Sequence, residues 1–142
     1  MSTDQILKKL RVFLLVFSIF IFIGTVFELS FLNHTRETIQ LTPFILVAIG
    51  IILALLMLIK PSPKMVRFVR VGMIIVFLGG VFGMGVHILN NLEPFIEGGR
   101  TATLGVLAQN AFGGKNPLLA PGILSLASLV ALAALYKHPG TK

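Results

Sequence analysis

Two ionisable residues lie within otherwise apolar runs of this chain, Glu28 and His87. A carboxylate and an imidazole can share a hydrogen bond, exchange a proton or contribute to a metal site. Each lies 17 residues after an arginine, Arg11 or Arg70. Because a helix rises about 1.5 Å per residue, both should lie about 25 Å from those anchors and share a depth. We therefore predict a contact between Glu28 and His87.

Three roles are open for such a contact. It could be a structural hydrogen bond that fixes the register of two helices. It could handle protons or ions, because ionisable groups inside a helix bundle often mark pathways. Metal or haem ligation is the third. A haem would lack its second histidine, because His34 and His138 fall elsewhere, and a metal bound by His87, His34, Glu28 and Glu93 would match no known ligand spacing.

No set of residues forms a recognisable catalytic site. We find no nucleophile–base pair, phosphate-binding loop or convincing pair of carboxylates. The absence of cysteine excludes disulfides, thiol nucleophiles and quinone-coupled thiol oxidases. The sequence therefore predicts a protein that is not an enzyme and that holds no cofactor or metal.

The composition is that of an integral membrane protein. Of the 142 residues, 56% are hydrophobic and only 12% are charged, and the mean hydropathy is +0.96. A soluble domain of this size needs a more polar surface. The formal charge of +7 could suggest nucleic acid. Because the cations flank apolar runs, we expect anionic lipid headgroups as partners and no nucleic acid.

Four apolar runs are long enough to cross a bilayer, whose hydrocarbon core needs about 20 residues of helix. The predicted spans are about 12–32, 42–59, 66–90 and 117–136, within a single transmembrane domain of residues 1–142. We expect Thr42 to cap the second helix and Ser62 to cap the third. The fourth helix should begin at Pro117 with a kink, or at Pro121.

The basic residues predict the orientation of these spans. Nine of the 12 lysines and arginines fall on one side: Lys8, Lys9, Arg11, Lys60, Lys64, Arg67, Arg70, Lys137 and Lys142. The other side holds Arg36, Arg100 and Lys115. The cation-rich side of a membrane protein faces the cytoplasm, so both termini should be cytoplasmic. We also expect headgroup contacts from the turn between the second and third spans, at Lys60, Lys64, Arg67 and Arg70.

Small residues gather on one side of the third and fourth spans. A helix turns about 100° per residue, which places Gly72, Gly79, Gly83, His87 and Asn90 on a single side of the third span. Ala127, Ala131 and Ala134 share a side of the fourth. Such sides allow close approach of another helix, either within the bundle or in a partner.

The first span carries a separate row of phenylalanines, with Gly24 among them: Phe13, Phe17, Phe20, Phe27 and Phe31. We interpret this row as helix packing or lipid contact.

The loop between the third and fourth spans, residues 92–117, is too long for a simple turn. Between paired glycines, residues 101–112 place five apolar side chains on one side: Leu104, Leu107, Ala108, Ala111 and Phe112. This pattern favours a short helix in the membrane interface over an irregular loop. The predicted fold is therefore an all-α integral membrane four-helix bundle with a short interfacial helix in its long outer loop.

The ending NPLLAPGILSLASLVALAALYKHP, residues 116–139, resembles a group of small, uncharacterised bacterial four-span inner-membrane proteins. This resemblance implies a bacterial inner membrane and carries no activity. We expect a non-catalytic accessory or assembly subunit that docks on a larger membrane complex, or on copies of itself, through its Gly/Ala-rich faces. The alternative is a small oligomeric transporter or channel that uses Glu28 and His87.

Overall fold

The computed structural model describes residues 2–31, 38–99 and 101–138, and all regular structure in these ranges is helical. The helices are α1 (Thr3–Phe31), the short 3₁₀ helix η1 (Thr38–Leu41), α2 (Thr42–Ile59), α3 (Pro63–Ile96), α4 (Leu104–Gly113) and α5 (Leu119–Ala134). The prediction of an all-α chain is confirmed.

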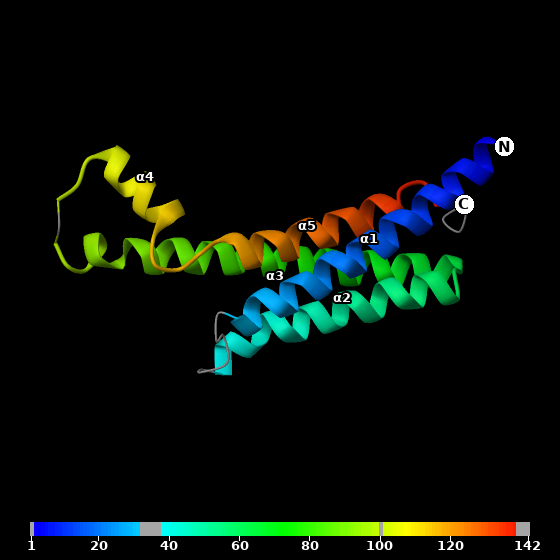
Figure 1. Cartoon of the computed structure of the whole chain (residues 1–142), viewed down its shortest axis with the longest axis horizontal. Coiled ribbons are helices and arrows are strands. Elements are labelled where there is room, and N and C mark those ends of the chain that lie inside the picture. The colour runs from blue at the N-terminus through cyan, green and yellow to red at the C-terminus, as the bar shows by residue number, and fades with distance from the viewer. Residues whose placement is uncertain (1, 32–37, 100, 139–142) are drawn as a thin grey trace.

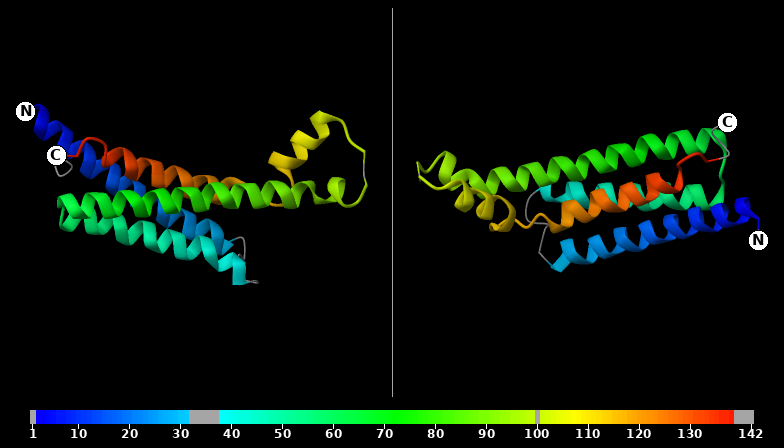
Figure 2. Two further views of the ribbon diagram at one scale, coloured as in Figure 1. Left: turned by 180° about the vertical axis from the view of Figure 1, so that it is seen from behind. Right: turned by 90° about the horizontal axis from the view of Figure 1, so that it is seen from above.

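Helices α1, α2, α3 and α5 pack side by side as a bundle in which successive helices run in opposite directions (Figure 1). Helix α1 packs against α2 and α5, and α3 packs against the same two helices. Helices α1 and α3 therefore occupy diagonal positions, and their described residues do not meet. The start of α1, the α2–α3 turn and the end of α5 lie together at one end of the bundle (Figure 2).

Three helices are long and apolar enough to cross a membrane, namely α1, α2 and α3. In their most apolar stretches only 28%, 28% and 17% of the residues are buried inside the bundle. The remaining apolar side chains face outward, as lipid-facing side chains would. Helix α5 is apolar but has only 16 residues, and the bundle buries it more completely.

The helix starts follow from local sequence, with one correction. The Ser62 hydroxyl accepts a hydrogen bond from the Met65 N–H at 3.2 Å, which confirms the predicted cap of α3. Thr42 is not the cap of α2, because η1 runs directly into that helix and Leu41 takes the cap position. Helix α5 begins at Leu119, and Pro121 lies in its first turn, where its missing N–H costs nothing.

Helix α3 extends beyond the other helices, and α4 folds back beside its far end (Figure 1). It is longer than the predicted span 66–90 and accommodates Pro94 near its last turn. The short helix α4 was predicted, and the Thr103 hydroxyl accepts a hydrogen bond from the Val106 N–H at 3.5 Å. On its predicted apolar side Ala111 is buried, while Leu104 and Phe112 are exposed.

The buried core of the bundle consists of aliphatic and methionine side chains and the aromatic ring of Phe22. Phe22 is fully buried, and it occupies the space beside Gly50 of α2, where a Cβ atom would lie 2.5 Å from the ring. The neighbouring Ser18 and Thr25 are buried on the same side of α1. The row of phenylalanines predicted on α1 lies on the opposite, exposed side of this helix.

Candidate functional site

The polar residues near the end of α3 hold the segment that leads into α5. The Nδ1 atom of His87 lies 2.6 Å from the Pro117 carbonyl oxygen. Because a carbonyl oxygen only accepts, Nδ1 carries the proton and donates it in this bond. His87 therefore does contact another segment of the chain, but this segment is the α4–α5 connection.

Asn91, one turn beyond His87, is the most connected side chain of this region. Its amide Nδ2 donates to the carbonyl oxygens of Ala111 at 3.2 Å and of Asn116 at 3.0 Å. Its Oδ1 accepts from the Asn116 backbone N–H at 2.8 Å and from the Asn116 side-chain amide at 3.1 Å. A buried amide with both donors and its acceptor satisfied fixes the position of its partners. Asn91 thus clamps the end of α4 and the segment after it onto α3.

The sequence predicted a packed face in this part of α3, but it placed Asn90 on that face instead of Asn91. The predicted glycine face of α3 included Asn90, which is exposed. The spacing of four residues between His87 and Asn91 would have been the better signal, because such residues lie on one side of a helix.

The predicted contact between Glu28 and His87 is wrong. Both residues lie toward the same end of the bundle, but α1 and α3 are diagonal, with α2 and α5 between them. Glu28 is half-buried at the edge of the packed side of α1, and no described residue forms a hydrogen bond or ion pair with it. The shared depth was a necessary condition for contact but not a sufficient one.

The described residues contain no group of three His, Cys, Asp or Glu side chains that could hold a metal ion. His34, which the metal alternative required, lies outside the described residues.

The predicted glycines do allow close helix packing, but against two different neighbours. A Cβ atom at Gly72 or Gly79 would collide with a leucine of α2, Leu53 or Leu46. At Gly83 it would lie 3.2 Å from Pro121 Cβ of α5. Among these helix contacts, the close approach of one backbone to another is at Gly80, which was not among the predicted glycines. There a Cβ atom would lie 2.8 Å from the Pro121 carbonyl oxygen and 3.0 Å from the Ser125 nitrogen.

The alanines of α5 are also used inside the chain. Ala127 and Ala131 are fully buried, and Ala134 is 1% exposed. Helix α5 lies between α1 and α3, which cover it from both sides (Figure 2). The Gly/Ala-rich faces therefore pack against other helices of this chain.

Two arginines reach the end of α5 from the two helices beside it. Arg11 of α1 donates from Nη2 to the Lys137 carbonyl oxygen at 3.2 Å. Arg70 of α3 donates from Nη2 to the Leu135 carbonyl oxygen at 3.1 Å. The last carbonyls of a helix lack partners within the helix and carry partial negative charge. Arg70 thus binds the carbonyl of the C-cap residue Leu135, and Arg11 binds a carbonyl three residues beyond the end of α5. The two bonds tie three helices together.

Of the four residues predicted to contact headgroups, three project outward and one does not. Lys60, Lys64 and Arg67 are exposed at the α2–α3 turn. Arg70 is half-buried because it turns inward to α5.

Beside these arginines lies His138, whose pKa is lowered from 6.5, first by burial and second by the positive charge of Arg11. The folded chain therefore binds the proton that charges the His138 imidazole less tightly than the unfolded chain does. The stability contributed by neutral His138 is therefore complete above pH 6.5 and is lost as the pH falls through the lowered pKa.

We predict that Arg11→Gln raises the pKa of His138 toward its ordinary value, because it removes one of the two causes of the shift. Histidine-selective NMR titration of the protein in detergent measures this change. Arg67→Gln removes an exposed arginine without touching the end of α5 and serves as the control. An unchanged His138 pKa in Arg11→Gln would contradict the assigned cause.

The polar side chains inside the bundle bond to nearby backbone. Ser18 donates to the Leu15 carbonyl at 2.8 Å, and Thr25 donates to the Ile21 carbonyl at 3.1 Å. In α5, Ser128 donates to the Leu124 carbonyl at 2.9 Å, and Ser125 donates across to the Phe77 carbonyl of α3 at 3.2 Å. These bonds satisfy each hydroxyl hydrogen within the protein.

Comparison of the chain with protein-family models, with curated proteins and with solved structures finds no match.

Proposed function

We propose that this chain is a four-span integral membrane protein and acts as a non-catalytic accessory or assembly subunit. The observation that carries the proposal is the distribution of apolar surface. In the most apolar stretches of α1, α2 and α3 only 28%, 28% and 17% of the residues are buried inside the bundle, while Ser18 and Thr25 of α1 bond to backbone carbonyls of that helix. In water such a surface would aggregate, whereas in a bilayer it faces lipid.

Helix α5 is the fourth span. Its 16 residues measure about 24 Å, somewhat less than a hydrocarbon core of about 30 Å. The adjoining apolar residues of the predicted span 117–136 supply the remaining length. Helices α1 and α3 shield α5 from lipid on both sides, which relaxes the requirement for a full-length helix.

The end of the bundle that gathers Lys8, Arg11, Lys60 and Lys64 faces the cytoplasm, and α4 lies at the opposite membrane surface. The support for this orientation is the excess of basic residues at one end. The resemblance of residues 116–139 to small bacterial four-span proteins supports a bacterial inner membrane.

The absence of cysteine allows a direct test of this topology. Single replacements Lys115→Cys and Lys60→Cys each convert an exposed lysine, one at each end of the bundle. We expect a membrane-impermeant maleimide to label Lys115→Cys in intact spheroplasts and to label Lys60→Cys only after lysis. Labelling of Lys60→Cys in intact spheroplasts would overturn the orientation.

We assign the docking of a partner to one exposed surface, the row of phenylalanines on α1. Phe13, Phe20, Phe27 and Phe31 are 61%, 70%, 61% and 84% exposed, and the stacked rings of Phe13 and Phe17 lie 5.9 Å apart. With Gly24, the row repeats at spacings of four and three residues, the repeat of helices that pack at a small angle. Gly24 has no atom within 4 Å of its Cβ position and leaves a notch in the row.

Gly24→Leu fills this notch and should weaken docking of another helix while leaving the bundle intact. The measurement is a native pull-down in mild detergent with quantitative mass spectrometry of co-purified subunits. Gly85→Leu is the matched control, because Gly85 also has open space at its Cβ position but lies on α3. Equal recovery of every subunit with both variants would contradict docking through α1.

The interior of the bundle gives the transporter alternative little support. The buried hydroxyls of α1 bond within that helix and do not line a path. Glu28 lies near one end of α1 without a described basic partner, and the predicted relay to His87 is not formed.

A further inference from the structure

A groove of about 380 Å³ opens at the end of the bundle where the chain begins. Its volume lies within the range of small-molecule sites, about 300 to 1,000 Å³. Helix α1, the end of α2 with the following turn, and the end of α5 form its walls. Three separate parts of the chain thus converge on one site.

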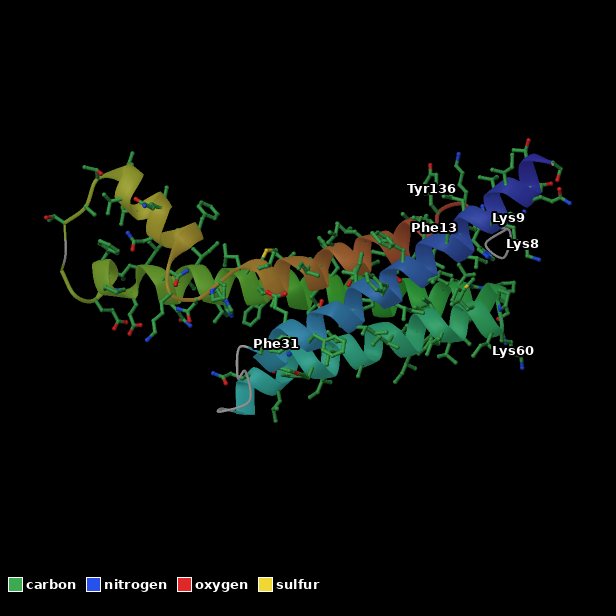
Figure 3. The ribbon with its side chains drawn as sticks, in the orientation of Figure 1. Lys8, Lys9, Phe13, Phe31, Lys60 and Tyr136 are labelled. Atoms are coloured by element: carbon green, nitrogen blue, oxygen red, sulfur yellow. The ribbon has the colours of Figure 1, made fainter. Side chains whose placement is uncertain are left out.

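The floor of this groove is apolar and its rim is charged. Leu15, Met57 and Ala134 are buried at its base. Lys8, exposed, and Arg11, half-buried, lie at its rim. Figure 3 shows that Lys8 of α1 and Lys60 of the α2–α3 turn lie at the same end of the molecule.

The rim is electropositive in spite of one acid, Asp4. Arg11 gives one N–H to the Lys137 carbonyl, and its guanidinium carries further donors. The charge of Arg11 also reaches His138, another residue of the rim, whose pKa it lowers. A guanidinium and an ammonium above an apolar surface suit a ligand that carries a phosphate and a hydrocarbon chain.

We propose that this groove binds one phosphate-bearing anionic lipid. The phosphate lies between Lys8 and Arg11, and the first part of an acyl chain covers Val12 and Leu58. The proposal rests on the proposed membrane topology, which brings the groove to headgroup level. A free phosphate would leave the accessible apolar lining, Val12 at 45% exposure and the half-buried Leu58, in contact with water, so the lipid is the better occupant.

Native mass spectrometry of the full chain in mild detergent tests this site, with phosphatidylglycerol as the probe. We expect one retained phosphatidylglycerol per chain, no retained phosphatidylcholine, and no displacement by inorganic phosphate. Lys8→Gln should raise the apparent Kd for phosphatidylglycerol about fivefold, the effect of one cation near an anionic lipid. Lys64→Gln, which removes an exposed lysine outside the groove, should not change it.

A second pair of variants keeps every charge in place. Val12 lines the groove and is 45% exposed, so Val12→Trp should fill the space and abolish lipid retention. Val16, one turn further along α1 and 52% exposed, lies outside the groove, and Val16→Trp should retain the lipid.

Three results would overturn the site. They are an equal weakening of phosphatidylglycerol binding in Lys8→Gln and Lys64→Gln, retention of this lipid by Val12→Trp, and displacement of this lipid by inorganic phosphate. The labelling of Lys115→Cys and Lys60→Cys separates this outcome from failure of the topology, because correct labelling without retained lipid contradicts the groove alone.

Discussion

Gly80→Ala should lower the free energy of unfolding of the detergent-solubilised protein by about 1 to 3 kcal/mol, the usual cost of overpacking. The new methyl group would meet the Pro121 carbonyl oxygen at 2.8 Å and the Ser125 nitrogen at 3.0 Å. Both are backbone atoms of α5 and cannot rotate away. The α3–α5 contact must therefore open, which also weakens the Ser125 hydrogen bond to Phe77. Equilibrium unfolding in mixed SDS micelles, followed by circular dichroism, measures the loss.

Gly85→Ala is the control for helix propensity. Gly85 lies on the same helix with no atom within 4 Å of its Cβ position. Alanine there should be neutral or should stabilise α3 by up to about 1 kcal/mol. If both variants unfold alike, the close approach of α5 at Gly80 contributes nothing to stability.

Asn91→Leu should release the α4–α5 connection from α3. The substitution removes the hydrogen bonds to Ala111 and Asn116 and leaves their backbone groups without a partner. An unpaired buried polar group costs about 1 to 3 kcal/mol. If the lost hydrogen bonds cost about 2 kcal/mol, the Asn116 amide hydrogen should exchange about thirtyfold faster with solvent. Hydrogen–deuterium exchange of the peptide that covers residues 111–117 measures this opening.

Asn90→Leu makes the same replacement at the adjacent, exposed residue and should leave exchange over this peptide unchanged. Exchange protection of the α1 and α2 peptides should stay the same in both variants, because the clamp lies outside the bundle. Faster exchange throughout the chain in Asn91→Leu would contradict a local clamp.

The positions of the helices could be predicted because hydropathy and proline mark them directly. The predicted second span, 42–59, coincides with α2. Helix α1 begins nine residues before the predicted Val12, because its first turns are polar and hydropathy detects only the apolar part of a helix. For the same reason α3 continues past residue 90 through Asn91 and Pro94.

The pairing of the helices could not be predicted in the same way. The depth of a residue in the membrane depends on its distance along its own helix. Contact between two residues also requires that their helices lie beside each other. Glu28 and His87 satisfied the first condition and failed the second. Gly80 was missed because the prediction assumed one packed side on α3. That helix contacts α2 at Gly79 and α5 at Gly80, so two adjacent residues pack against different helices.

The diagonal placement of α1 and α3 has a consequence for biosynthesis. Until α5 is made, these two helices are joined only through α2, and the slot between them is open. Gly80 and the side chain of Arg70 then lack the α5 surface that they contact in the finished protein. A chain that ends before α5 would leave this slot uncovered.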